Sequence, residues 1–145
     1  MSKYFLFFLA AFSISSTFAD EIKPKEPCAN FHVTGLNLKV VAPFIENVKQ
    51  NIIKNQIKQL AEQVSYPVKF NSRKKKKVIK DKKAFLAEFP KFINKKWKQM
   101  VVGSNEKNAV CNSEGVGLNK GSLWITAPRF HTKPNVLKII AINVY

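Results

Sequence analysis

The carboxylates that could act as acids, bases or metal ligands are spread thinly along this chain. Only 9 of its 145 residues are Asp or Glu, and of these Glu88 and Glu114 alone fall beside segments expected to form the core. Acid–base or nucleophilic catalysis needs paired carboxylates, or a nucleophile beside a base. The sequence contains no such pair, no phosphate-binding loop and no metal motif. It therefore favours a protein that is not an enzyme and holds no cofactor or metal.

One enzymatic alternative stays open. His32 and His131 are the only histidines, and they could converge as the base and the acid of a two-histidine ribonuclease, a class of small, basic, secreted enzymes. The residues around neither histidine match that class, and the chain has 2 cysteines rather than several. RNA cleavage therefore remains an alternative, and the two histidines are the only residues that favour it.

Positive charge is the strongest compositional feature. Lys and Arg number 25, and the formal net charge is +16. Such a charge favours anionic partners such as phosphates, acidic proteins or anionic membrane surfaces. Five basic residues in succession are the candidate anion-binding residues, and a run of like charges is expected to form a solvated loop: Arg73, Lys74, Lys75, Lys76 and Lys77. Codons rich in A and T also produce a Lys-, Asn- and Ile-rich composition, so charge alone does not establish binding.

The N-terminus has the pattern of a secretory signal peptide over residues 1–19. Lys3 supplies the positive charge, Tyr4–Ile14 is apolar, and Thr17-Phe18-Ala19 suits cleavage. We expect a secreted protein, periplasmic or extracellular, whose mature chain starts near Asp20. No second long apolar stretch follows, so no membrane span is expected in the mature chain. Residues 20–41 are expected to be an N-terminal lead-in, and residues 42–145 one domain.

Two cysteines in an oxidising compartment suggest one disulfide. We expect Cys28 and Cys111 to be bridged, which would tie the N-terminal segment to a strand near the C-terminal hairpin. A metal site is a poor alternative, because the two histidines show no ligand spacing.

Apolar periodicity predicts the helices. Residues 43–64 repeat apolar side chains every three or four positions, so they predict one amphipathic helix with Pro43 in its first turn. Residues 66–70 predict an edge strand, because a proline lies near its start. Asp81 can cap a second helix, which is expected to break or kink at Pro90. Residues 91–101 predict a further helical piece that contains Trp97.

The C-terminal third predicts strands. Residues 109–111 begin them, and Asn119-Lys120-Gly121 predicts the turn of a hairpin. Gly115 and Gly117 are expected to leave room for a helix that crosses the sheet, or to clear the wall of a pocket. Trp124 or Trp97 is expected in the main core. Residues 136–144 are apolar on both faces, which predicts a central strand covered on both sides.

This order of elements predicts an α+β domain, with helices packed on one face of a curved antiparallel sheet. Three segments carry a resemblance to small secreted bacterial proteins of the nuclear transport factor two-like superfamily, a cystatin-like α+β cone: residues 64–70, residues 85–93 and the glycine hairpin of residues 117–125. The resemblance covers residues 45–144. Since that fold serves enzymes, binding proteins and inhibitors alike, it implies a scaffold rather than an activity.

Two classes of binding protein follow from these patterns. In one, the cone offers a pocket or surface for a partner protein or small ligand, as an inhibitor or immunity-type protein would. In the other, the lysine-rich surface attracts anionic lipid, nucleic acid or polysaccharide. Loss of binding at modest salt would indicate the second class.

Overall fold

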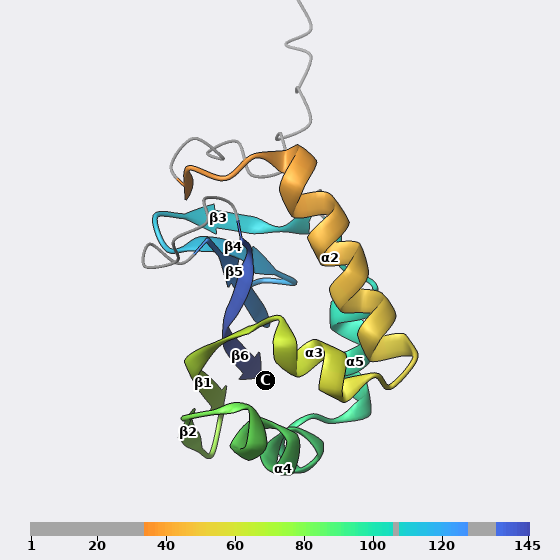
Figure 1. Cartoon of the computed structure of the whole chain (residues 1–145), viewed down its shortest axis with the longest axis vertical. Coiled ribbons are helices and arrows are strands. Elements are labelled where there is room, and N and C mark those ends of the chain that lie inside the picture. Colours follow the sequence, from red (N-terminus) through yellow and green to blue (C-terminus); the bar gives the residue numbers. More distant parts are fainter. Residues whose placement is uncertain (1–33, 106–107, 128–135) are drawn as a thin grey trace, which may run out of the picture.

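The computed structural model describes residues 34–105, 108–127 and 136–145. The expected signal peptide, Cys28, His32, His131 and most of the expected lead-in lie outside these residues. Within them the chain forms an α+β domain, as predicted, with helices lying to one side of a six-stranded sheet (Figure 1). The elements in chain order are α2 (Leu38–Ile53), α3 (Ile57–Glu62), β1 (Val64–Ser72), β2 (Lys76–Ile79), α4 (Lys82–Phe92), α5 (Lys95–Val102), β3 (Val110–Asn112), β4 (Gly115–Leu118), β5 (Leu123–Thr126) and β6 (Lys138–Val144).

The expected first helix is two helices, and it starts earlier than predicted. The Asn37 side chain accepts a hydrogen bond from the backbone N–H of Lys39 and caps α2, so Pro43 lies inside the helix rather than in its first turn. The chain then breaks at Asn55, which has φ 53°. Asn tolerates this left-handed conformation better than most residues. Apolar spacing continues across the break, which is why periodicity alone predicted one helix.

Three side-chain amides, from residues before and after this break, link the two helices to each other. The Asn51 amide donates to Asn47 Oδ1 at 3.2 Å and to Gln63 Oε1 at 2.9 Å, while Gln63 Nε2 donates to Asn47 Oδ1 at 2.7 Å. Asn51 is buried, so these bonds satisfy polar atoms that would otherwise be costly to bury. The network therefore ties α2 to the end of α3, just before β1 begins.

The sheet is mixed, whereas the sequence predicted an antiparallel sheet throughout, and its strand order is β2-β1-β6-β5-β4-β3. β1 pairs with β6 in parallel and with β2 antiparallel, so the prediction of an edge strand at residues 66–70 was wrong. Its proline is accommodated where the register between β1 and β6 shifts, between Val64 and Lys69. β6 lies third in the order, which confirms its predicted central place.

An aromatic cluster holds α4 against the sheet. The Asp81 side chain caps α4 by accepting from the Ala84 N–H at 2.8 Å, as predicted. Phe85 from α4 packs edge-to-face on Phe70 of β1, with ring centroids 5.6 Å apart. The helix does not break at Pro90, because the Ile93 N–H still donates to the Phe89 carbonyl at 3.0 Å and closes another turn.

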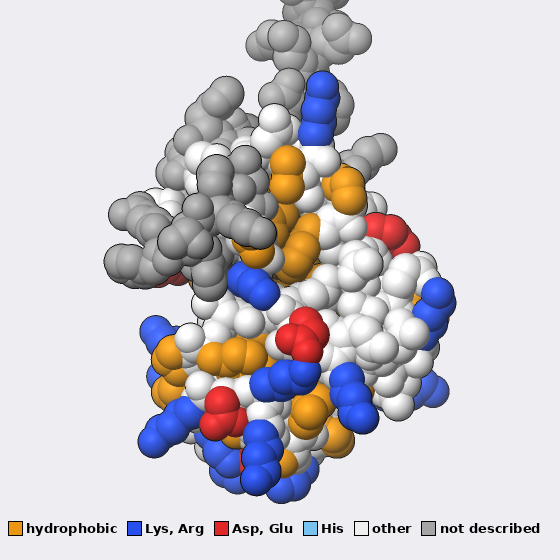
Figure 2. Space-filling model, viewed as in Figure 1, with side chains coloured by type: hydrophobic (Ala, Val, Ile, Leu, Met, Phe, Trp, Pro, Cys, Tyr) orange, Lys and Arg blue, Asp and Glu red, His pale blue; other side chains and the backbone are white. Residues whose placement is uncertain are grey.

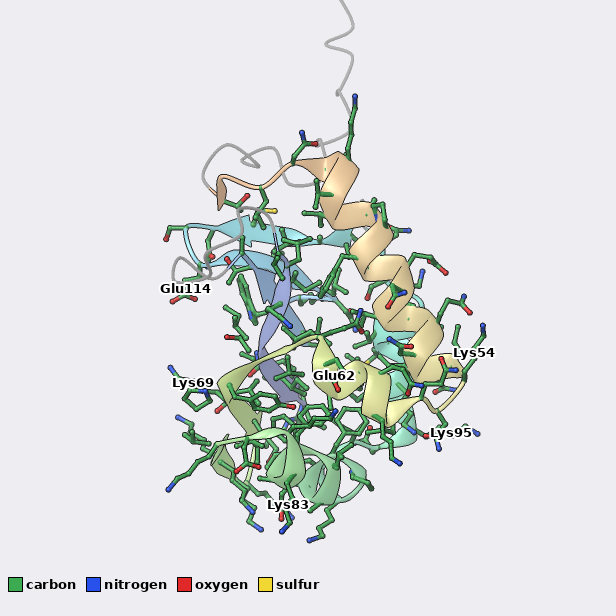
Figure 3. The ribbon with its side chains drawn as sticks, in the orientation of Figure 1. Lys54, Glu62, Lys69, Lys83, Lys95 and Glu114 are labelled. Carbon is green, nitrogen blue, oxygen red and sulfur yellow. The ribbon has the colours of Figure 1, made fainter. Side chains whose placement is uncertain are left out.

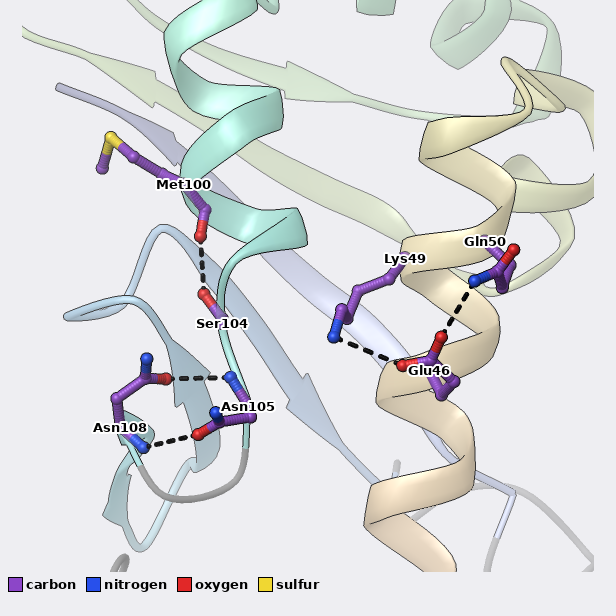
Figure 4. A network of polar contacts seen from close by, with 7 residues as sticks. All are labelled: Glu46, Lys49, Gln50, Met100, Ser104, Asn105 and Asn108. Atoms are coloured by element: carbon purple, nitrogen blue, oxygen red, sulfur yellow. Dashed lines mark hydrogen bonds and ion pairs between the residues drawn. The ribbon is translucent and has the colours of Figure 1, made fainter.

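Trp97 of α5 lies in the core and is 2% exposed. Its indole Nε1 donates to two backbone carbonyls of the sheet, that of Ser122 at 3.2 Å and that of Asn143 at 3.0 Å. α5 is therefore tied to β6 and to the β4–β5 turn by hydrogen bonds as well as by packing. Beyond the helix, the Ser104 hydroxyl donates to the Met100 carbonyl (Figure 4).

The glycine hairpin forms as predicted, and Asn119, Lys120 and Gly121 all have positive φ. The two strand glycines make room for β5 and its tryptophan rather than for a helix or a pocket. A Cβ on Gly117 would stand 3.1 Å from Trp124 Cε2, and a Cβ on Gly115 only 2.1 Å from the backbone oxygen of Ile125. Gly115 also has φ 142°.

We expect Gly115→Ala to lower the free energy of unfolding by about 2 kcal/mol or more, because the added Cβ meets backbone at a strained φ. Gly35→Ala is the matched control, since Gly35 has φ 65° but nothing within 4 Å of a built Cβ. Urea denaturation of both variants measures the difference. Equal losses would show that the close approach to Ile125 does not matter.

Trp97→Ala is expected to cost about 3–5 kcal/mol, the usual range for a buried tryptophan. Trp97→Phe keeps most of the packing but removes the indole donor from two carbonyls, so it should cost about 1–3 kcal/mol. Thermal and urea unfolding give these values. A Trp97→Phe variant as stable as the parent would mean that the two hydrogen bonds contribute nothing to stability.

Candidate functional site: a basic groove on the outer face of the sheet

The two faces of the sheet differ in chemistry. Strand register places four fully buried residues in one line on the face toward the helices: Phe70, Ile142, Leu123 and Leu118. We call the opposite face the outer face. One line of register pairs crosses all six strands there, and we call it the outer row: Val78, Lys69, Ala141, Trp124, Gly117 and Val110.

The five basic residues 73–77 occupy three kinds of position in the β1–β2 hairpin. Arg73 and Lys74 form the exposed tip, closed by the Ser72 N–H donating to the Lys75 carbonyl at 2.7 Å. Lys76 and Lys77 belong to β2, so the expected solvated loop was wrong for these two residues. Since successive strand residues face opposite sides, Lys76 lies on the outer face and Lys77 on the side of α4.

The outer face of this hairpin forms a groove of about 430 Å³, which we call the basic groove, lined by Lys69, Asn71, Lys76, Lys77 and Val78. Lys69 is paired with Val78 and Asn71 with Lys76. Lys69 and Lys76 are therefore diagonal neighbours on one face, and such residues stand about 7–8 Å apart. An extended anionic chain can contact two amines at this spacing.

Basic side chains gather at the end of the molecule that β1, β2 and α4 form (Figure 2). Lys69 points away from the helices, whereas Lys54 and Lys95 lie on the opposite side of the molecule (Figure 3). Within the described residues, no carboxylate forms an ion pair with Lys69 or Lys76. Their charges are thus available to an anion from outside the protein.

Lys77, by contrast, is neutralised within the fold. Its Nζ lies 2.7 Å from Glu88 Oε2, and Lys91 Nζ lies 3.3 Å from Glu88 Oε1. The hydrogen bond from Lys77 is the main cause that lowers the pKa of Glu88, against a smaller opposing effect of burial. Lys77 therefore stabilises the contact between β2 and α4 rather than the groove.

Lysines on edge strands commonly prevent unwanted strand pairing. That explanation fits Lys76, because β2 is an edge of the sheet. It does not fit Lys69, because β1 is flanked by β2 and β6. Two cations with no carboxylate partner repel each other on a sheet face, and such local conflicts are expected at functional sites. The pair is thus better explained by binding than by edge protection.

The other predicted site residues do not join this groove. Trp97 is in the core, while Trp124 is half-buried on the outer face above Gly117. Cys111 lies on β3 and is half-buried, but Cys28 is outside the described residues, so the disulfide stays a prediction. Both histidines are outside them too. In the described part of the chain, no three His, Cys, Asp or Glu side chains converge on a possible metal position.

The face toward the helices, where a cone could offer a pocket, holds core side chains, among them Phe70, Phe85 and Phe89. Tyr66 packs edge-to-face on Phe85 and donates its hydroxyl to the Ala61 carbonyl at 3.0 Å. Burial, followed by the nearby Glu62 and Asp81, raises the pKa of Tyr66, so the phenol stays protonated and structural. A second hollow of about 370 Å³ lies between α2 and α5 and includes one lysine, Lys98, in its lining.

Sequence analysis missed Lys69, Asn71 and Val78 as parts of the site. Val68 and Phe70 are fully buried whereas Lys69 is exposed, so apolar–polar alternation over residues 68–71 carries the signal, while Lys76-Lys77-Val78-Ile79 does not alternate. That alternation shows which residues share a face within the strand. It does not show which strands pair, and the groove depends on the pairing.

No helix within the described ranges is long and apolar enough to cross a membrane. Comparison with protein-family models, with curated proteins and with solved structures found no match to this chain. The resemblance to the nuclear transport factor two-like superfamily therefore stays a prediction based on short motifs.

The ion pair at Glu88 predicts a dependence of stability on pH. A lowered pKa in the folded state means that Glu88 contributes stability above its unfolded pKa, and that this contribution disappears as pH falls through the folded pKa. Thermal melts should show that Glu88→Gln is less stable than the parent at neutral pH, and that the two converge below about pH 4. A constant difference down to pH 3 would contradict this assignment.

Proposed function

We propose that this protein is a non-enzymatic binding protein that captures an anionic partner at the basic groove. The observation that carries the proposal is the pair Lys69 and Lys76, which share the outer face beside Asn71 with no carboxylate partner in the described part of the chain. Arg73, Lys74 and Lys75 at the hairpin tip extend the positive surface beyond the groove.

The chemistry of the groove supports binding rather than catalysis. Lysine amines can hold an anion, but the groove offers neither a nucleophile beside a base nor paired carboxylates. Glu88 is engaged by two lysines on the side of α4. An anion is thus held without being transformed.

The outer face is favoured over the face toward the helices for a physical reason. A ligand on the inner face would have to displace packed aromatic side chains such as Phe70 and Phe85. Such close-packed cores resist added volume. On the outer face Lys69, Lys76 and Val78 are exposed, so a ligand there need not displace packed side chains of the described residues. The signal-like residues 1–19 support a setting outside the cytoplasm, where acidic proteins, anionic lipids, nucleic acids and polysaccharides are the available polyanions.

The double variant Lys69→Gln/Lys76→Gln should weaken binding to heparin, used as a generic polyanion. Loss of two contacts should lower the slope of log affinity against log salt by about two units. The matched control is Lys54→Gln/Lys95→Gln, which removes the same charge from exposed lysines on the opposite side of the molecule (Figure 3). Affinity is measured by titration calorimetry over a salt series.

The comparison between the two double variants decides the proposal. If both weaken heparin binding equally, net charge alone drives the attraction and the groove is not a site. Circular dichroism and melting temperature should be close to those of the parent for both, because Gln keeps the length of the side chain and all four positions are exposed.

A further inference from the structure

Trp124 stands in the same outer row as Lys69. Lys69 pairs with Ala141, and Ala141 pairs with Trp124. Neighbouring strands lie 4.7–4.9 Å apart, so the backbones of Lys69 and Trp124 are about 10 Å apart with only a small side chain between them. A cation and an aromatic ring thus share one continuous surface.

The indole of Trp124 rests on glycine backbone. A Cβ on Gly117 would stand 3.1 Å from Trp124 Cε2, and a Cβ on Gly121 would stand 2.9 Å from Trp124 Nε1. The Nε1–Cε2–Cζ2 edge of the indole therefore lies against the β4–β5 hairpin. Trp124 is nevertheless only half-buried, so part of the ring reaches solvent on the outer face. The glycines leave the room that the indole occupies there.

Asn71 adds a fixed hydrogen-bond acceptor in the line of register pairs next to the outer row, opposite Lys76 and Asn143. Its Nδ2 donates to Asn143 Oδ1 at 2.8 Å, and Asn143 Nδ2 donates to the Gly121 carbonyl at 2.6 Å. This chain of bonds orients the Asn71 amide and leaves Asn71 Oδ1 as an acceptor beside Lys69 and Lys76. An acceptor oxygen repels a bare phosphate, so the surface favours a ligand that brings donors and a flat ring together with its negative charge.

Single-stranded nucleic acid has this combination. Its backbone carries phosphates, its bases have flat faces, and base edges supply N–H donors. Proteins bind single strands with a positive groove and aromatic rings on which bases stack. A polyphosphate would use the lysines but gain nothing from Trp124 or from Asn71. A lipid surface can take up an interfacial tryptophan, so vesicles are included in the test below.

We propose that the outer face binds single-stranded nucleic acid, with Lys69 and Lys76 contacting phosphates and Trp124 stacking on a base. This inference rests on the proposed function and names its partner class. Duplex DNA is disfavoured, because its bases are stacked on one another and cannot reach the indole. Sequence preference should be weak, because every base has a face to stack.

The test compares two oligonucleotides of equal charge. One has about 12 thymidines, a length in the range that single-strand-binding domains cover, and the other has the same number of abasic sites. The parent protein should bind the thymidine strand more tightly. Trp124→Ala should weaken that binding between about 5-fold and about 150-fold, the range for loss of one stacked base, and leave the abasic strand unaffected. Trp124→Phe should retain most of the affinity.

Fluorescence gives a second measurement that does not depend on the stability of Trp124→Ala. The protein has 2 tryptophans, and Trp97 is 2% exposed. The thymidine strand should quench the parent, whereas Trp124→Phe, which keeps only Trp97, should show almost no quenching. Quenching of equal size in both proteins would overturn the proposal.

The two proposals fail differently. If the parent binds both strands equally and Lys69→Gln/Lys76→Gln weakens both, the basic groove is an anion site but the nucleic-acid inference is wrong. If phosphatidylglycerol vesicles displace the thymidine strand, and Trp124→Ala changes the affinity for neither the thymidine strand nor the abasic strand, the partner is a membrane surface and the inference is wrong. If the lysine substitutions change nothing, the proposed function itself fails.

Discussion

The parallel pairing of β1 with β6 is the contact on which the rest of the structure depends. β1 and β2 come from residues 64–79, whereas β3 to β6 come from residues 110–144. β1 joins these two groups into one sheet through its pairing with β6. On one side the pairing sets Phe70 beside Ile142 in the core, and on the other it sets Lys69 beside Ala141. The core and the outer row therefore arise from the same register.

The buried indole of Trp97 and the amide of Asn143 reinforce that register from opposite sides. Trp97 Nε1 donates to the Ser122 and Asn143 carbonyls from the side of the helices. The Asn143 side chain, which is 8% exposed, accepts from Asn71 and donates to the Gly121 carbonyl on the outer face. A one-residue shift of β6 would break the three of these hydrogen bonds that involve Asn143 and turn apolar residues toward water, so the pairing is strongly specified.

Local patterns predicted the elements well where one residue type dominates the conformation. The Asp81 cap, the turn at residues 119–121 and the central place of β6 follow from short-range chemistry. Two of the predictions that were wrong gave too much weight to a proline: α4 continues past Pro90, and the strand that contains Pro67 is flanked on both sides. The third gave too much weight to apolar spacing, which continues across Asn55 although the helix ends there. The basic groove could be predicted only in part, because the run at residues 73–77 is visible in the sequence while the contribution of Lys69 depends on pairing between strands.

The distance along the chain between β1 and β6 has a consequence during synthesis. Asn71 and Asn143 are 72 positions apart, so at about 5–20 residues per second β1 is made roughly 4 to 14 seconds before its parallel partner. Throughout that interval one side of β1 has no strand beside it, and an open strand edge readily pairs with another chain. The repulsion between lysines on β1 and β2 of neighbouring nascent chains opposes such pairing. The same positive charge that we assign to binding in the finished protein would then keep the unfinished one from aggregating.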